Sequence, residues 1–133
     1  MTRHYLLILT FMLALTGCAT EGVSDQPTVE SKLEEWGLVR GETIVRIPNF
    51  NITSWRSINN KSLVVTTGVR TNYLLELQHS CQELRSAFGI GFDSKSATLN
   101  RYDSVIVRTN QNRGGRRCPI AEMTRLNEAE SDS

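Results

Sequence analysis

The chain has 133 residues, 22% of them charged, and a formal net charge of +1 at pH 7. Once an N-terminal leader is set aside, this length accommodates one small domain and excludes a multidomain protein. The near-neutral total hides a basic centre: residues 43–125 carry twelve basic and five acidic side chains, whereas residues 19–42 carry six acidic and two basic ones and residues 126–133 three acidic ones.

The N-terminus has the three parts of an export signal. One cation, Arg3, precedes an apolar run over residues 5–15, and Leu15-Thr16-Gly17-Cys18 resembles a bacterial lipobox. The run would rise only about 16 Å as a helix, against roughly 30 Å for a bilayer core, which disfavours a permanent transmembrane helix. We predict a signal peptide over residues 1–17 and a diacylglycerol on Cys18. The remaining alternative is a plain secretory signal that leaves Cys18 as a stray thiol.

A lipidated Cys18 makes a membrane the first expected partner of the chain. Two or more acyl chains hold a protein stably on a membrane. In Gram-negative lipoproteins an Asp directly after the lipidated cysteine commonly marks retention in the inner membrane, and here that residue is Ala19. The resemblance therefore implies the periplasmic face of the outer membrane rather than the inner membrane. Nucleic acid is not an expected partner there.

Residues 18–42 are predicted to hold the lipidated cysteine, a small polar tether and a short amphipathic helix. Pro27 suits the first turn of a helix, and Gly37 is placed to end it. An apolar stripe at helical spacing lies between them: Val29, Leu33 and Trp36.

A strand-rich globular domain is predicted over residues 43–126. Asn59 and Asn60 suit a tight hairpin turn between two strands. Residues 73–78 alternate between apolar and other side chains with period two, which predicts a half-buried strand. The expected strands of this antiparallel meander cover residues 43–47, 55–58, 63–67 and 73–78.

Ser80 and Glu83 resemble the two ends of a capping box. They predict a short helix from Cys81 to about Phe88, with Leu84 and Phe88 facing inward. The glycines at positions 89 and 91 would break this helix.

The last third of the domain is predicted to hold a hairpin and a final strand. The hairpin joins residues 97–99 to residues 104–108, and a flexible stretch follows over residues 109–117. Residues 118–126 fit either a helix or an edge strand, and we favour the strand. Residues 127–133 are predicted as an acidic disordered tail. The fold class is thus mainly β, with α+β at the margin: a small antiparallel meander or partly open barrel with one or two short helices and one disulfide.

Two cysteines remain besides Cys18, namely Cys81 and Cys118. Cysteine pairs in an exported, oxidising compartment most often form disulfides. A metal site is the competing interpretation, but His79 would be the only histidine available to join them, and no CxxC or HxxxH spacing is present. We therefore predict a disulfide and no metal.

The order of these residues resembles a family of short Gram-negative lipoproteins catalogued only as a domain of unknown function. The resemblance spans roughly residues 44–126 and includes the cysteine pair and its spacing. Its other positions are Trp55, Leu63 to Val65, Gly68, Tyr73-Leu74-Leu75, Leu84, Arg101-Tyr102-Asp103, Val105, Val107, Arg117 and Ile120. The family has no assigned activity, so the resemblance implies one compact domain behind a lipidated leader and supplies no functional residues.

The sequence offers no catalytic constellation. It has no GxSxG elbow, and His79 precedes the predicted helix as an ordinary solvent-facing histidine would. A glycosidase needs two carboxylates held across one bond, and nothing in the sequence pairs the acids of the domain, which are Glu76, Glu83, Asp93, Asp103 and Glu122. No phosphate-binding glycine loop is present, and no cofactor is expected.

One cluster favours binding of anions. Arg108, Arg113, Arg116 and Arg117 fall within ten residues that contain no acid. The guanidinium fork suits phosphate and carboxylate oxygens, so anionic envelope polymers or another envelope protein are candidate partners; an ordinary solvated arginine loop is the alternative. We expect an envelope lipoprotein with a noncatalytic binding or accessory domain. The alternatives are a small hydrolase or inhibitor acting on the cell wall, or a structural subunit of an envelope complex.

Overall fold

Antiparallel strands dominate the computed structural model, which describes Gly17 and residues 26–130. The predictions for the signal peptide, for Cys18 and for the tether up to residue 25 lie outside the described residues. The elements in chain order are α1 (Val29–Glu35), β1 (Leu38–Ile44), β2 (Arg46–Ile47), β3 (Ile52–Ser57), β4 (Ser62–Thr67), β5 (Thr71–Leu77), the 3-10 helix η1 (Leu84–Ser86), β6 (Gly89–Asp93), β7 (Leu99–Asn100), β8 (Ser104–Arg108) and β9 (Arg116–Glu128).

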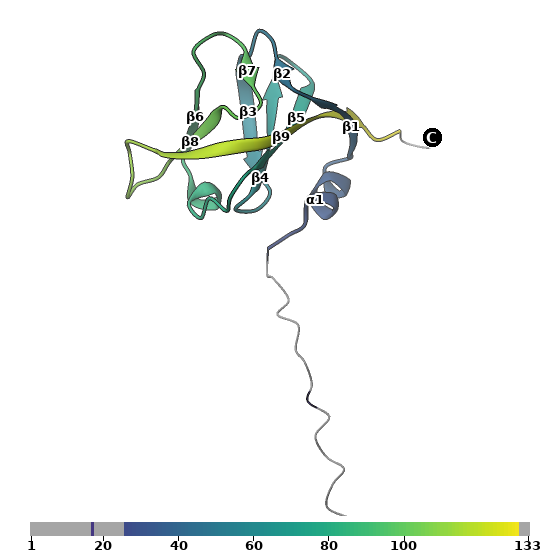
Figure 1. Cartoon of the computed structure of the whole chain (residues 1–133). Coiled ribbons are helices and arrows are strands. Elements are labelled where there is room, and N and C mark those ends of the chain that lie inside the picture. The colour runs from purple at the N-terminus through teal and green to yellow at the C-terminus, as the bar shows by residue number, and fades with distance from the viewer. Residues whose placement is uncertain (1–16, 18–25, 131–133) are drawn as a thin grey trace, which may run out of the picture.

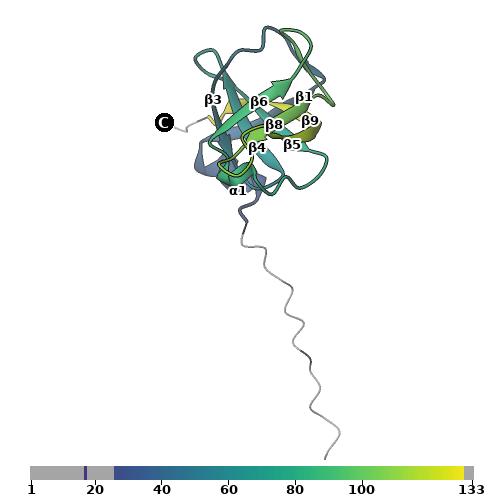
Figure 2. The same ribbon diagram turned by 90° about the vertical axis from the view of Figure 1, so that its left-hand side faces the viewer.

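Seven strands form one curled antiparallel sheet, a half-barrel, in the order β3-β4-β5-β9-β8-β6 with β1 also paired to β9 (Figures 1 and 2). The short strands β2 and β7 pair separately. The predicted fold class, mainly β with a partly open barrel and one disulfide, is confirmed. The strand region begins at Leu38, ahead of the predicted start at Thr43, and runs to Glu128.

The final strand, β9, is the centre of the sheet rather than the predicted edge strand. It pairs with β5 along one side, and with β8 and then β1 along the other. Pro119 is tolerated in this central strand because it lies beside a register shift in the β5 ladder, where its carbonyl accepts a hydrogen bond from the Gln78 amide at 2.9 Å. Proline lacks only the backbone N–H donor. At such an irregular position, its presence therefore destabilises the pairing of the strands little.

Around β5 the sheet is covered on both faces, which explains an incomplete prediction for this strand. Tyr73, Leu75 and Leu77 point into the main core inside the half-barrel, as their alternation predicts. Leu74 points the other way, but it is fully buried because it packs in a second, smaller core with Leu33 of α1. The helix therefore packs on the domain, as its apolar stripe predicts.

Local capping explains where α1 begins and ends. Thr28 is the N-cap, and its hydroxyl accepts a hydrogen bond from the Ser31 amide at 3.2 Å. Pro27 thus precedes the cap instead of occupying the first turn. Gly37, with φ +68°, reverses the chain after the helix as predicted.

The predicted helix over residues 81–88 is wrong. Only the single turn η1 forms, Ser80 caps nothing in it, and Phe88 is 60% exposed, whereas Leu84 is buried as predicted. Cys81 is held by its disulfide and by a 2.7 Å hydrogen bond from its amide to the carbonyl of Asn60. These ties and the start of β6 at Gly89 leave no room for a regular helix.

The predicted hairpin between residues 97–99 and 104–108 is also wrong. β8 pairs with β6, and β7 pairs with β2. Gly89 and Gly91 both lie within β6 and do not end a helix. A Cβ on Gly91 would lie 2.8 Å from Nη1 of Arg108, so this glycine makes room for that side chain. The stretch before β9 is a bonded turn in which the Thr109 amide reaches the Asn112 carbonyl at 3.1 Å.

Candidate functional site

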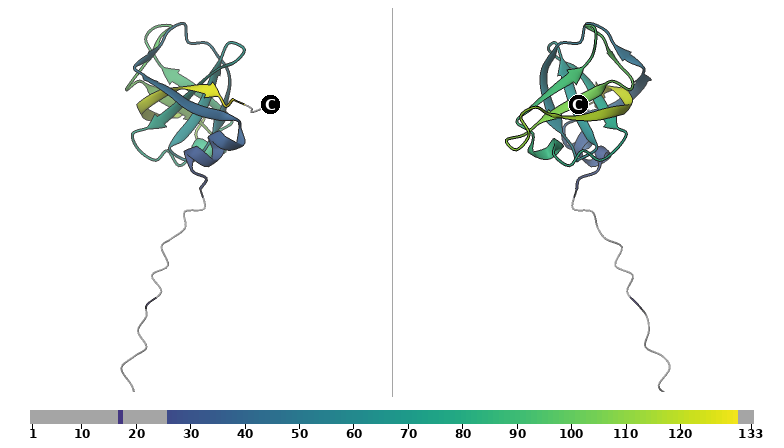
Figure 3. Two further views of the ribbon diagram at one scale, coloured as in Figure 1. Left: turned by 90° about the vertical axis from the view of Figure 1, so that its right-hand side faces the viewer. Right: turned by 60° about the vertical axis from the view of Figure 1, so that its left-hand side comes forward.

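The chain enters the domain at one end of the half-barrel, which we call the tether end. The Gln26 side chain accepts a hydrogen bond from the Asn60 amide at 3.1 Å, and the Pro27 carbonyl accepts one from the Asn59 side chain at 3.1 Å. These bonds fix the N-terminal segment to the β3–β4 turn. The views in Figures 1, 2 and 3 agree that α1 lies at this end, while the loop from β6 to β7 lies at the opposite end.

A polar pocket of about 380 Å³ lies at that opposite end, and we call it the far-end pocket. It is built from the end of β6, the β6–β7 loop and the turn between β7 and β8. Serine hydroxyls brace the loop: Oγ of Ser94 donates to the Thr98 carbonyl at 2.6 Å. The lining residues are Asp93, Lys95, Ser96, Asn100, Tyr102, Asp103 and Ser104.

Tyr102 is the most unusual residue of this pocket. Its φ is +75°, a left-handed conformation that costs an L-residue roughly 1–2 kcal/mol. Its side chain is nevertheless 63% exposed, so burial of the ring does not offset this cost. Strained residues of this kind concentrate at functional sites, where the surrounding structure holds them.

The neighbours of Tyr102 hold its backbone in place. The Arg101 amide donates to the Val45 carbonyl at 2.9 Å, and Nε of Arg101 donates to the Ala121 carbonyl at 2.8 Å. The guanidinium of Arg101 also lies 5.0 Å from the centre of the Tyr102 ring. The ring is therefore presented to solvent from a fixed backbone.

Two carboxylates that the sequence left unpaired line the same pocket. Asp103 accepts a hydrogen bond from the Asn100 amide at 2.8 Å, and Asp93 forms an ion pair with Arg117. Both acids thus hold local structure. The sequence signal that could have found this site is the Arg101-Tyr102-Asp103 run, which the family resemblance included without a role.

The structure divides the four arginines predicted to bind anions. Arg116 and Arg117 point to opposite faces of β9: Arg117 joins Asp93 at the far-end pocket, and Arg116 lies 3.3 Å from Glu83. Arg108 lies over Gly91 on the outer face of the sheet. Arg113 is exposed in the β8–β9 turn. They do not form one site.

The predicted disulfide between Cys81 and Cys118 is present and lies in the main core. Among Gly17 and residues 26–130, no group of three or more His, Cys, Asp or Glu side chains is placed to hold a metal ion. His79 is exposed in the loop after β5, away from the residues that line the far-end pocket.

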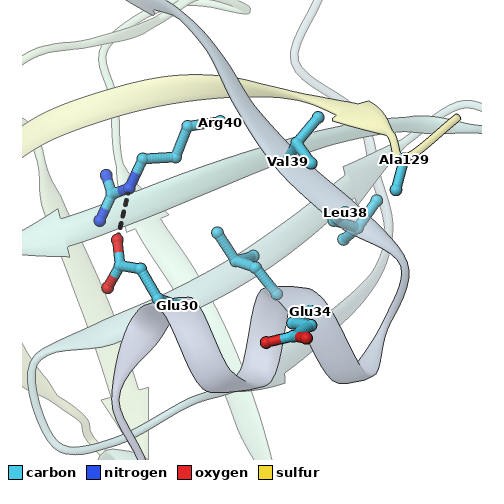
Figure 4. Close-up of a pocket in the computed structure, with 7 residues that line it drawn as sticks. Glu30, Glu34, Leu38, Val39, Arg40 and Ala129 are labelled. Atoms are coloured by element: carbon cyan, nitrogen blue, oxygen red, sulfur yellow. Dashed lines mark hydrogen bonds and ion pairs between the residues drawn. The ribbon is translucent and has the colours of Figure 1, made fainter.

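A second, apolar pocket of about 310 Å³ lies between α1 and β1 (Figure 4). Leu33, Leu38 and Val39 form part of its wall, and Glu30 and Arg40 form an ion pair at 2.9 Å beside it. This hydrogen bond from Arg40 is the main reason that the pKa of Glu30 is lowered. Arg40 also donates a hydrogen bond to Glu76 of β5 at 2.7 Å. This second bond is the main reason that the pKa of Arg40 is raised. Arg40 therefore ties α1 to the sheet.

Within the part of the chain that the structure describes, no helix has the length and apolar character needed to cross a membrane. No curated protein and no solved structure matches the chain. A family model does match, over residues 1–133, and confirms the expected membership of a family without assigned activity. The chain belongs to this family of unknown function, DUF6491.

Proposed function

We propose that this protein is an envelope lipoprotein, anchored through Cys18 at the periplasmic face of the outer membrane, whose domain binds a saccharide in the far-end pocket without catalysis. The observation that carries the binding role is Tyr102, an exposed aromatic ring on a backbone held in a costly conformation. The lipobox-like Leu15 to Cys18 segment supports the anchor.

The chemistry of the pocket suits a polyhydroxylated ligand. An aromatic ring offers a flat, partly apolar surface to the C–H face of a sugar. Carboxylate oxygens accept hydrogen bonds from hydroxyl groups, and amide and hydroxyl side chains both donate and accept them. The pocket has carboxylates on Asp93 and Asp103. It also has an amide on Asn100 and hydroxyl groups on Ser96 and Ser104.

A cell-wall hydrolase is the second candidate, and one observation favours it. Two carboxylates in one pocket are the minimum for glycoside hydrolysis. We favour binding because Asp93 is engaged by Arg117 and Asp103 by the Asn100 amide. Prolonged incubation of the domain with peptidoglycan, followed by chromatography of released fragments, separates the two. Fragment release that disappears in Asp93→Asn or Asp103→Asn would establish the hydrolase.

The binding role is tested by calorimetric titration with soluble peptidoglycan fragments and, separately, with core oligosaccharide of lipopolysaccharide. Tyr102→Ala should lower the affinity for the bound saccharide by about tenfold or more, as loss of an aromatic anchor does. Phe88→Ala is the matched control, because Phe88 is comparably exposed at 60% but lies outside the pocket. Equal affinities of wild type and Tyr102→Ala for both saccharides would contradict the proposal.

The anchor is tested by membrane fractionation and by labelling with a palmitate analogue. Cys18→Ser should abolish labelling and remove the protein from membrane fractions. Ala19→Asp should shift it from the outer to the inner membrane. Absence of label in the wild type would rule out lipidation.

A further inference from the structure

The second strongly exposed aromatic ring of the described chain, Phe88, belongs to a segment that is bonded to other segments with exposed basic residues. It follows η1 and is 60% exposed. We call the surface around it the basic corner. Its members are Phe88 and four exposed basic residues, Lys61, Arg85, Arg113 and Arg116.

Backbone hydrogen bonds bring this corner together from three loops. The amide of Leu77 donates to the Lys61 carbonyl at 2.8 Å, which joins the β3–β4 turn to the end of β5. The amide of Phe88 donates to the Arg108 carbonyl at 3.0 Å, which joins the segment after η1 to β8. The Cys81–Cys118 disulfide links the segment before η1 to β9, and the amide of Cys81 donates to the Asn60 carbonyl at 2.7 Å, which joins that segment to the β3–β4 turn. The corner is therefore a fixed surface.

The charge of the corner is only partly neutralised. Arg116 pairs with Glu83 at 3.3 Å, and this contact leaves Lys61, Arg85 and Arg113 to set the sign of the surface. α1, which lies at the same end of the molecule, carries three acids. Glu30 pairs with Arg40 and Glu35 pairs with Lys32, whereas the exposed Glu34 forms no ion pair within the described residues. One unpaired acid of α1 is thus outnumbered by three basic side chains.

The corner lies at the tether end. The β3–β4 turn that carries Lys61 is the turn to which Gln26 and the Pro27 carbonyl are bonded. Gln26 follows Cys18 by eight positions, and eight Cα-to-Cα steps span at most about 28 Å when the chain is fully extended. An anchor on Cys18 would hold Gln26, and with it the β3–β4 turn of the basic corner, within about that distance of the lipid surface.

We propose that the basic corner docks the domain onto the anionic phospholipid headgroups of the membrane that holds its anchor. The guanidinium groups bind headgroup phosphates, and the ring of Phe88 enters the interface beside them, as aromatic side chains do at membrane surfaces. This docking rests on the proposed anchor for its orientation. It turns the far-end pocket away from the bilayer.

The test uses the chain from residue 18 onward, with Cys18→Ser, so that no acyl chain contributes. This chain contains every helix and strand of the structure. Its partitioning is measured by flotation on vesicles of phosphatidylglycerol and phosphatidylcholine, and on vesicles of phosphatidylcholine alone. We expect binding to the anionic vesicles that weakens with salt. Arg85→Ser and Arg113→Ser should each lower the partition coefficient about fivefold at low ionic strength.

Phe88→Ala should lower partitioning on the same vesicles by a few-fold. The matched control is Val69→Ala with Arg70→Ser, an exposed apolar and basic pair in the β4–β5 turn, at the other end of those strands. This control should leave partitioning unchanged. Equal effects of corner and control variants, or equal binding to neutral vesicles, would overturn the proposal.

Two further outcomes are informative. If the corner variants lose affinity for lipopolysaccharide but not for phospholipid vesicles, the corner binds a polymer and the proposal is wrong. If the wild type carries no lipid label while vesicle binding still depends on the corner, the docking surface stands and the anchor fails. If the wild type is lipidated but the basic corner does not bind anionic vesicles, the docking is rejected and the proposed anchor stands.

Discussion

The two ends of the half-barrel each present one aromatic ring to solvent, but in different settings. Phe88 at the tether end is 60% exposed and belongs to the basic corner, in which one of four basic side chains, Arg116, has an acidic partner. Tyr102 at the far end is 63% exposed and lines a pocket that holds acidic, basic and neutral polar side chains. The backbone of Tyr102 adopts a left-handed conformation, with φ +75°. An apolar ring with cations suits an extended anionic surface, whereas a phenol among hydroxyls, amides and carboxylates suits a small neutral polar ligand.

The two ends are also stabilised differently. A covalent link, Cys81–Cys118, holds the loops of the tether end to the main core. The far end depends on hydrogen bonds, such as those of Arg101 to Val45 and Ala121. Breaking each kind of support should therefore affect one end more than the other.

The largest effect is expected from removing the disulfide. Cys81 and Cys118 are 37 residues apart, and closing a loop of this length contributes about 3–4 kcal/mol in the chain-entropy account. Replacing both by Ser should lower the free energy of unfolding in urea by about that amount. Amide exchange should quicken first in residues 78–88. Cys18→Ser is the control and should leave stability unchanged; faster exchange confined to residues 94–103 would contradict the assignment of the disulfide to the tether end.

A smaller effect, of opposite sign, is expected at the far end. Tyr102→Gly removes the left-handed strain and should leave the free energy of unfolding unchanged or raise it by up to about 1 kcal/mol. The same variant should lose saccharide affinity. Tyr102→Ala, which keeps a Cβ at φ +75°, should lose affinity without the gain in stability. A marked loss of stability in Tyr102→Gly would show that the ring supports the fold instead of a ligand.

The sequence predicted the parts of this comparison that depend on local patterns. The β3–β4 turn at Asn59 and Asn60, the alternation in β5 and the end of α1 at Gly37 are all set by neighbouring residues. The disulfide followed from the count of cysteines and the expected compartment. These features predict a mainly β fold with one disulfide. They do not predict which side chains gather at either end of the half-barrel.

The features that were missed depend on contacts between distant residues. The pairing of β6 with β8 is non-local, and it is favoured by Gly91, because the side chain of Arg108 fills the space that a Cβ there would need. In the sequence, the same glycine predicts the end of a helix. The exposure of Phe88 follows from the fixed position of Cys81. The far-end pocket brings Asp93 and Asp103 together through that same pairing, and no local pattern in the sequence predicts it.

A modest effect is expected from the ion pair at the edge of the far-end pocket. Arg117 is the predicted anion-binding residue that pairs with the far-end pocket, through Asp93. Arg117→Gln should leave stability within about 1 kcal/mol, because exposed ion pairs contribute little. It should change saccharide affinity, since it frees a carboxylate of the pocket, and leave vesicle partitioning unchanged. A loss of vesicle binding in this variant would place Arg117 with the basic corner.

The smallest effect concerns the ion pair that keeps α1 at the tether end. The hydrogen bond from Arg40 lowers the pKa of Glu30 in the folded chain. A carboxylate with a lowered folded pKa stabilises the fold above its ordinary value and loses that contribution as the pH falls through the lowered one. Because the Glu30 side chain is 70% exposed, the contribution should stay below about 0.5 kcal/mol. Carboxyl NMR titration should show the pKa of Glu30 rising toward its ordinary value in Arg40→Gln, with the matched Arg46→Gln variant leaving it in place. If both variants titrate like the wild type, Arg40 does not hold Glu30, and α1 is kept on the sheet by the packing of Leu33 against Leu74 alone.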